Sequence, residues 1–435
     1  LNGINNTVRS IAGTGTVQNN HASTAATLTV GGSNASTTFS GVMVNGGVGT
    51  LGLTKVGTGM LTLSGASTYS GITTVQGGGI RITGSVNNSP TGAGGTTVIG
   101  NTSGTFGLVE VPTGGNLTTD TISVGGTAGG VGSLVIRGGS VNTTDTAATT
   151  SGISIGTGGN GSLLLSGGSF SANRVSLYNS ATGTGVLQVS GGTLTSNEYI
   201  ILSNLRTEFT ITGGSVLHNT ASQNLAIAYN LSGTTVMNVA GGSVDNTGRS
   251  VSFGQLSANS PTGILNLGAG TLTTSTVTVG STVNATINFN GGTLRAAVDS
   301  TAFIPSSSRL NTYVNGAFGT FGGGAIIDTN GKSVTIASSL LSPVGSSGVS
   351  GLSVGGTGSG YIGAPYVEIV RGAGDSTGTG ATGYATIDTD PSSLTYGQVT
   401  SVVLTNPGMN YTATPTVNLI GGLGAGGTAA VITAS

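Results

Sequence analysis

The middle of the chain repeats one pattern of apolar and polar positions. Apolar residues alternate with Thr, Ser or Asn, a pair of glycines follows, and Ser or Thr with one apolar residue begins the next alternation. A period of two predicts β-strands with one buried face. The phrase occurs seven times: SLVIRGGSV (133–141), LLLSGGSF (163–170), VLQVSGGTL (186–194), FTITGGSV (209–216), VMNVAGGSV (236–244), ILNLGAGTL (264–272) and INFNGGTL (287–294).

The spacing of the phrases predicts a solenoid with one phrase in each coil. Successive phrases lie 22 to 29 residues apart, enough for two or three short strands and their turns. Leu163 and Leu165 are expected to point inward, as are Val236 and Val239 with a slip in register. The glycine pairs are expected at the corners, because glycine accepts positive φ without steric cost. Coils stacked at about 4.8 Å would make residues 1–345 a rod of roughly 13 coils, on the order of 60 to 70 Å long.

Composition supports an all-β fold with a narrow core. The chain has 435 residues, of which 83 are glycine, 36% are hydrophobic and 4% are aromatic, with no Trp. Thr and Val favour strands, and so few bulky groups suit thin layers better than a broad sandwich. The prediction is a right-handed parallel β-helix (β-solenoid), since crossovers between parallel strands are normally right-handed.

The last fifth of the chain follows a different pattern. Residues 346–435 align on themselves at an offset of 50, which pairs Tyr361 with Tyr411 and Pro365 with Pro415. The segment resembles the tandem "GSGYTSAPTV" β-repeats of bacterial surface and phage tail-associated proteins. We expect a small C-terminal β-sandwich-like domain of two repeats, with its boundary in SPVGSSG (342–348). This domain is expected to cover one end of the solenoid.

One segment resembles a known family. Residues 51–82, LGLTKVGTGMLTLSGASTYSGITTVQGGGIRI, contain Lys55, the pair Gly57 and Gly59, and the motif TYSG at 68–71. They resemble the autotransporter-associated β-strand repeat of bacterial passenger domains, and residues 1–20 and 26–42 resemble the sequence that commonly precedes it. The resemblance is strongest over residues 1–85. The resemblance implies a right-handed β-helix exported to the cell surface, typically in long adhesive or structural proteins, and it does not imply catalysis.

Charge and cysteine content exclude several classes of function. With 11 basic and 12 acidic residues, the net charge is −1, so no basic face is expected to bind nucleic acid. The chain has no cysteine, which excludes disulfides and thiolate metal sites. The sequence contains no run of 18 apolar residues, so no membrane-spanning helix is predicted. An extracellular or bacterial cell-surface location is expected.

The best candidate for catalysis is a pair of acids one coil apart. Asp120 and Asp145 lie in NLTTDTIS and VNTTDTAA, and glycoside hydrolysis needs two carboxylates on either side of the bond to be cleaved. The alternative is that both acids bond to backbone amides in polar turns. The second interpretation is favoured.

Other charged groups are expected to be structural. Asp245 with Arg249, and Glu198 with Glu208, are interpreted as solvated surface charges. A Zn²⁺ site is not expected, because no cysteine accompanies the two distant histidines, His21 and His218.

The loop GAGDSTGTGATG (372–383), with Asp388 and Asp390 after it, could suggest calcium. It lacks the repeat of calcium-binding β-rolls, and a flexible loop is the preferred interpretation. Sequons for glycosylation begin at Asn116 and Asn230.

The predicted function is structural. We expect a subunit of an extracellular fibre that self-assembles head-to-tail through its N-terminal coil, with no catalytic residue, cofactor or metal. The alternative is a surface adhesin that presents the β-helix to glycans or matrix. A third hypothesis is a polysaccharide lyase or hydrolase using Asp120 and Asp145.

Overall fold

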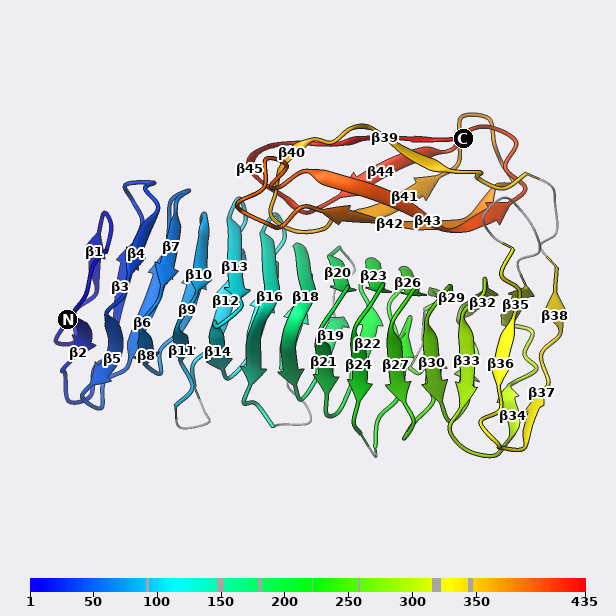
Figure 1. Cartoon of the computed structure of the whole chain (residues 1–435), viewed down its shortest axis with the longest axis horizontal. Coiled ribbons are helices and arrows are strands. Elements are labelled where there is room, and N and C mark those ends of the chain that lie inside the picture. The colour runs from blue at the N-terminus through cyan, green and yellow to red at the C-terminus, as the bar shows by residue number, and fades with distance from the viewer. Residues whose placement is uncertain are drawn as a thin grey trace.

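The computed structural model describes residues 1–90, 94–146, 152–178, 182–220, 222–256, 259–314, 322–342 and 347–435. These residues form strands and turns without a helix. The all-β fold and the parallel solenoid of about 13 turns are therefore confirmed. Figure 1 shows the coils stacked along a straight rod, with a second layer of strands on one side. Part of the predicted boundary, residues 343–346, lies outside the described residues.

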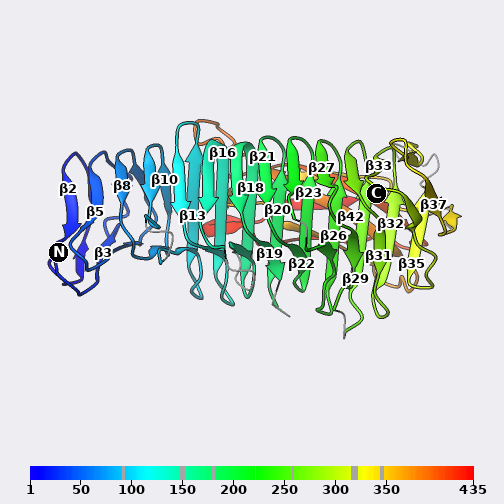
Figure 2. The same cartoon turned by 90° about the horizontal axis from the view of Figure 1, so that it is seen from below.

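Each coil contributes to three parallel ladders, which Figure 2 shows stacked from end to end. The first ladder contains β1 (Asn6–Val8), β3 (Ala26–Val30), β6 (Leu51–Lys55), β9 (Thr73–Val75), β12 (Thr97–Ile99), β15 (Ile122–Val124), β17 (Ile153–Ile155), β19 (Val175–Tyr178), β22 (Ile200–Ser203), β25 (Leu225–Ile227), β28 (Val251–Phe253) and β31 (Val277–Val279).

The second ladder contains β4 (Thr37–Phe39), β7 (Met60–Leu63), β10 (Gly79–Ile82), β13 (Phe106–Pro112), β16 (Val131–Thr143), β18 (Asn160–Ala172), β20 (Thr184–Val189), β23 (Arg206–Ile211), β26 (Thr234–Val239), β29 (Thr262–Leu267), β32 (Asn284–Phe289), β35 (Leu310–Val314) and β38 (Leu340–Leu341). Its strands β16 and β18 continue through the corner into the third ladder.

The rest of the third ladder is β2 (Thr16–Asn19), β5 (Val42–Gly46), β8 (Ala66–Thr68), β11 (Ser85–Asn87), β14 (Asn116–Thr119), β21 (Thr193–Ser196), β24 (Ser215–His218), β27 (Ser243–Asn246), β30 (Thr271–Thr274), β33 (Thr293–Ala296) and β36 (Ile326–Asp328). Near the end of the rod, β34 (Ser300–Ile304) pairs with β37 (Val334–Ile336).

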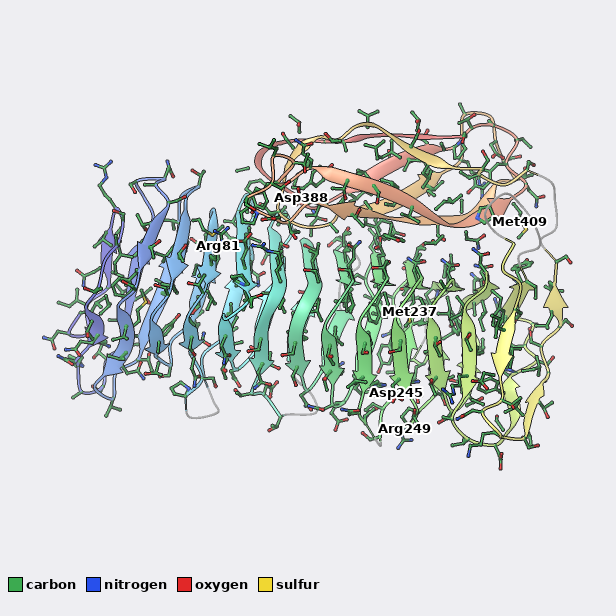
Figure 3. All side chains as sticks on the ribbon, in the orientation of Figure 1. Arg81, Met237, Asp245, Arg249, Asp388 and Met409 are labelled. Carbon is green, nitrogen blue, oxygen red and sulfur yellow. The ribbon has the colours of Figure 1, made fainter. Side chains whose placement is uncertain are left out.

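One continuous apolar core runs along the inside of the rod. Leu163 and Leu165 point into it as predicted. In the segment VMNV (236–239) the predicted slip in register was wrong. Met237, labelled in Figure 3, and Val239 belong to the core, and the strand is in regular register with its neighbour. Val236 points outward in register with Glu208, yet is only 4% exposed because the C-terminal domain covers it.

The glycine pairs lie at the corners, and two constraints require glycine there. The second glycine has positive φ in four phrases, at Gly168, Gly192, Gly214 and Gly242, and the first does in two, at Gly138 and Gly291. Successive corners also approach closely: a Cβ on Gly168 would lie 1.9 Å from the Gly139 carbonyl oxygen. Neither glycine of the phrase 264–272 has positive φ, so close packing is the constraint on Gly270.

The C-terminal domain consists of antiparallel pairs. Its strands are β39 (Leu352–Gly356) with β46 (Val431–Ala434), β40 (Ser359–Tyr361) with β45 (Leu423–Thr428), β41 (Tyr366–Val370) with β44 (Thr416–Ile420), and β42 (Thr379–Ile387) with β43 (Val399–Met409). The two tyrosines that align at an offset of 50 play equivalent parts. The Tyr361 hydroxyl accepts a hydrogen bond from the Ala430 N–H, and the Tyr411 hydroxyl accepts one from the Ala381 N–H.

This domain lies along the side of the rod, over the second ladder from β13 to β35, and the expectation that it covers an end was wrong (Figure 1). Apolar residues on the outer face of the second ladder explain the position, because they need a cover. No helix in the described part of the chain has the length and apolarity to cross a membrane.

Candidate functional site

The C-terminal domain is attached to the rod by an apolar patch at one end of the interface. Leu108, Val135, Leu164 and Val186 point outward from four successive strands of the second ladder, and Tyr366 of β41 packs against them, together with Ala364. All are buried. Burial of apolar surface is favourable by about 25 cal/mol per Å², so this patch stabilises the attachment.

Further along the same face, a row of polar side chains runs parallel to the rod axis. Asn288 donates to Asn266 at 2.9 Å, Asn266 donates to Asn238 at 2.7 Å, and Asn238 donates to Thr210 at 2.9 Å. Asn266 also donates to Thr382 of the C-terminal domain. We call these four rod residues the Asn row. They are buried and bonded to one another, as buried amides require.

The Asn row ends at a buried carboxyl group, Glu208. This side chain is 1% exposed, and its Oε1 accepts hydrogen bonds from Thr210 at 2.9 Å and from Gln188 at 3.1 Å. Gln188 also donates to the backbone carbonyl of Ala385 in the C-terminal domain. Burial raises the pKa of Glu208 to about 8, against the opposing effect of the two hydrogen bonds. The interpretation of Glu208 as a solvated surface charge was wrong, because a distant part of the chain covers it.

A charged cluster closes the interface at the end nearest the N-terminus. Glu110 accepts from Arg81 at 2.6 Å and from the Tyr396 hydroxyl at 3.1 Å. Arg137 lies 3.8 Å from Glu110 and 3.9 Å from Asp390 of the C-terminal domain. Burial and the Glu110 charge raise the pKa of Tyr396. The cluster thus ties both parts of the chain together electrostatically, near Arg81 and Asp388 in Figure 3.

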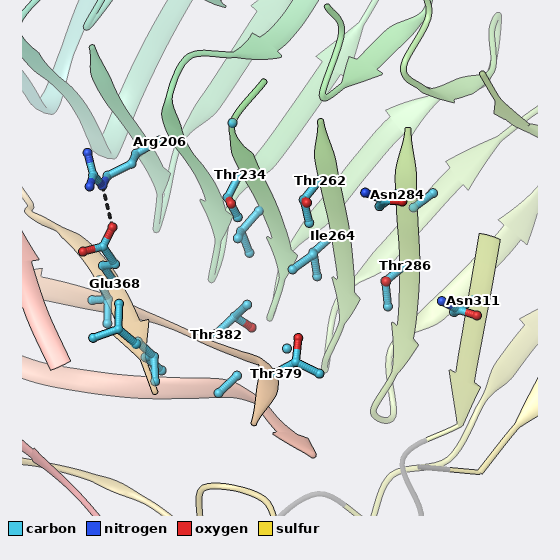
Figure 4. Close-up of a pocket in the computed structure, with 18 of the residues that line it drawn as sticks. Arg206, Thr234, Thr262, Ile264, Asn284, Thr286, Asn311, Glu368, Thr379 and Thr382 are labelled. Atoms are coloured by element: carbon cyan, nitrogen blue, oxygen red, sulfur yellow. Dashed lines mark hydrogen bonds and ion pairs between the residues drawn. The ribbon is translucent and has the colours of Figure 1, made fainter. Parts of the chain in front are cut away.

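Between the apolar patch and the far end of the rod, the two parts separate to form a cleft of about 880 Å³ (Figure 4). One wall is the outer face of β23, β26, β29, β32 and β35, and the other is β41 with the beginning of β42. At one side Arg206 donates to Glu368 at 2.7 Å and joins the walls. This volume is typical of a site for a small molecule or a short polymer segment.

Asp120 and Asp145 lie on successive coils as predicted. The Asp145 N–H donates to the Asp120 carbonyl at 3.2 Å, so the two residues occupy equivalent places in neighbouring turns. The Asp120 carboxylate accepts from the Gly94 N–H at 3.4 Å. This contact fits the interpretation as a polar turn. Neither residue is among those that line the cleft.

The remaining predicted pairs are not assembled into one site. Asp245 bonds to Thr247 in an exposed turn near Arg249, on the side of the rod away from the C-terminal domain (Figure 3). Glu198 lies in the corner after β21, where it accepts from the Ser222 hydroxyl at 2.9 Å, whereas Glu208 lies under the C-terminal domain. The structure therefore does not bring the two glutamates together.

The two histidines form hydrogen bonds that stabilise a corner and a turn. His218 is buried, with Nδ1 2.6 Å from the Asn246 side chain and Nε2 2.5 Å from the Glu198 carbonyl, and burial lowers its pKa. His21 Nδ1 accepts from the Thr24 N–H at 2.9 Å. Within the described residues, no three His, Asp or Glu side chains are grouped so that they could hold a metal ion.

The loop at 372–383 is organised by its own acid. The Asp375 carboxylate accepts from the N–H groups of Thr377 and Gly378, both at 2.9 Å, and from Thr412 N–H at 3.2 Å. These bonds hold the pKa of Asp375 below its usual range. The prediction of a loop was wrong for residues 379–383, which begin β42 (Thr379–Ile387), so the loop itself ends at Gly378.

The segment that resembled a known family has two buried polar anchors. Lys55 is 1% exposed, and its Nζ donates to the carbonyls of Val56 and Gly57 in its own coil and of Gly77 in the next coil. Burial lowers the pKa of Lys55 to about 8. The Tyr69 hydroxyl lies 2.7 Å from Thr73 Oγ1, and burial raises the pKa of Tyr69 to about 12. Lys55 therefore bonds its own corner to that of the next coil, and Tyr69 holds the corner between β8 and β9.

Comparison with protein families finds a match over the segment that contains Lys55 and Tyr69. Residues 53–82 match the family described as passenger-associated-transport-repeat. No curated protein and no solved structure matches the chain. The chain is thus a parallel β-solenoid that carries a passenger-associated-transport-repeat, and both features fit an autotransporter passenger.

Proposed function

We propose that the chain is a structural unit of a surface-exposed or secreted fibre, in which the coils of one copy continue into those of the next. The observation that carries this proposal is that, within the described residues, the strands at both ends of the solenoid pair on one side only, while the C-terminal domain lies along the side of the rod. A parallel ladder with a free edge can accept a further strand of the same direction.

At the N-terminal end, β1 and β2 pair on one side only within the described residues. Ile4 is 66% exposed, and Leu1, Ile11 and Val17, which pack against the core, are only partly buried. Exposed apolar groups at an open ladder edge favour association.

The opposite end of the solenoid also has exposed apolar residues and strands that pair on one side within the described residues. Ile326 and Leu340 are 47% and 48% exposed, and Ile327, Val334 and Ile336 are only partly buried against the core. Strands β36, β37 and β38 are each paired with the preceding coil. An end-to-end contact would therefore bury apolar surface from both partners and pair their free edges.

The test is electron microscopy of the full chain at high concentration, together with light scattering. The expected result is filaments of uniform width that lengthen with concentration. Ile4→Lys with Val8→Lys should abolish them, because charge on an edge strand opposes pairing. Val48→Lys with Ile72→Lys, which alters exposed apolar residues of similar kind, is the matched control and should still polymerise. Dispersed monomers of the unmodified chain at every concentration would overturn the proposal.

A second candidate function is that of a surface adhesin, which the cleft beside the C-terminal domain favours. Neither function requires catalysis. The enzyme hypothesis would gain support only if the chain degraded a polysaccharide and Asp120→Asn with Asp145→Asn abolished that activity.

A further inference from the structure

The cleft contains a set of polar side chains that have no partner among the described residues. Thr234, Thr262, Asn284, Thr286 and Asn311 line it, and their side-chain hydroxyl and amide groups form no hydrogen bond with any described residue. We call them the free polar set. They come from four successive strands, β26, β29, β32 and β35, and Figure 4 shows them on the same wall.

The Asn row on the same strands behaves differently. Asn238, Asn266 and Asn288 are buried and bond to one another, whereas every member of the free polar set is at least partly exposed. The free groups are therefore hydrated and available to a ligand, and a ligand hydroxyl can replace each bound water at little cost.

The spacing and charge of the cleft restrict the chemistry of its occupant. Its polar groups recur at the coil repeat, about 4.8 Å, and each can both donate and accept. On the opposite wall, Ile369 and Val370 of β41 supply apolar surface that is partly exposed. The charge of Arg206 is neutralised by Glu368, so a polyanion finds little to pair with except Arg309 at the rim.

We propose that this cleft binds a linear, uncharged oligosaccharide, whose hydroxyl groups bond to the free polar set while its C–H faces lie on the apolar residues. The repeating polar groups match a repeating ligand. The proposal rests on the adhesin function, to which it adds a site and a ligand class, and it is independent of fibre formation.

The test uses the full chain on an array of glucan, mannan and galactan oligosaccharides of three to six units, with acidic oligosaccharides alongside, followed by calorimetry on the best neutral binder. Thr234→Val with Thr262→Val removes two hydroxyls and retains shape and strand preference. Binding should weaken about tenfold or more. Thr195→Val with Thr273→Val makes the same change on the third ladder, away from the cleft, and should leave binding unchanged.

Failure to bind any oligosaccharide, binding of acidic ones alone, or equal binding by the two double variants would each overturn the proposal. A chain that forms filaments and binds no oligosaccharide would overturn this inference and leave the fibre proposal standing. A chain that binds the oligosaccharide and remains monomeric would overturn the fibre proposal and leave this inference standing.

Discussion

Attachment of the C-terminal domain should weaken as pH rises, and Glu208→Gln should remove this dependence. In the attached state the pKa of Glu208 is about 8, and its ordinary value is 4.5. When the domain separates, Glu208 lies on the open face of β23 and recovers an ordinary pKa. Between pH 4.5 and about pH 8, Glu208 then holds fewer protons in the separated state than in the attached state. Attachment is therefore fully stable below pH 4.5 and loses about 1.4 kcal/mol per pH unit up to about pH 8.

At pH 7 the loss amounts to about 3 kcal/mol. The glutamine variant avoids it, because an amide resembles the protonated carboxyl. Its oxygen can accept from Gln188 and Thr210, and its NH₂ group takes the place of Oε2, which has no hydrogen-bond partner within the described structure. The other titratable groups near Glu208 are Tyr366 and Tyr384, whose pKa values burial raises, so both stay neutral over this range, and the Arg206–Glu368 ion pair.

The absence of cysteine allows a direct assay. Val186 is buried under the C-terminal domain, so Val186→Cys should react with a thiol reagent only when the domain separates. After correction for thiol ionisation with a free peptide thiol, labelling should rise up to tenfold per pH unit between about pH 5 and 8. In the Glu208→Gln background it should be flat and, at pH 7, on the order of 100-fold slower.

The control is Glu198→Gln, which changes a glutamate outside the interface and should keep the slope of the parent chain. Equal slopes in the parent chain and in the Glu208→Gln variant, or faster labelling of that variant at pH 7, would refute the reasoning.

Three further changes probe the rod. Leu163→Ala should destabilise its coil by about 2–5 kcal/mol through loss of buried surface and a cavity, seen as faster amide hydrogen exchange in β16, β18 and β20. Lys55→Met should cost about 1–3 kcal/mol, because three carbonyls lose their donor, and exchange should accelerate in residues 51–82 rather than along the whole rod. Asn266→Leu should leave the Asn238 side-chain oxygen without a donor and the Asn288 amide N–H without an acceptor, and so weaken attachment of the C-terminal domain, measured by the same thiol reaction; unchanged labelling would show that the Asn row does not contribute.

The rod could be predicted because its determinants are local. Alternation placed Leu163 and Leu165 inside, and the glycine pairs marked the corners. The slip proposed for Val236 failed because an apolar outer residue was mistaken for a core residue. Alternation alone cannot distinguish a second buried face from an irregular strand.

A signal for the covered face was nevertheless present. The runs 134–136 and 163–165 are each three consecutive apolar residues, and strands buried on both faces have this composition. In later phrases the same outer position holds Asn238, Asn266 or Asn288. In the sequence, the outward-facing residues of the second ladder thus change from apolar to polar along the rod. The partner that provides the cover, and the burial of Glu208, depend on contacts between residues more than a hundred positions apart and follow no local pattern.

This change along the interface explains why a cleft forms at all. Where the outer face is apolar, at Val135 and Leu164, the C-terminal domain packs directly against it. Where the face carries Thr262 and Asn284, close contact would bury hydroxyl and amide groups that the C-terminal domain does not bond, at a cost of about 1–3 kcal/mol for each group. The domain therefore contacts the rod at the apolar patch and at the Asn row, where Asn266 donates to Thr382, and stands away from the rod where the polar residues of the cleft lie. The polar groups that prevent closure are the same ones that remain available to a ligand, so attachment and binding are two consequences of one graded surface.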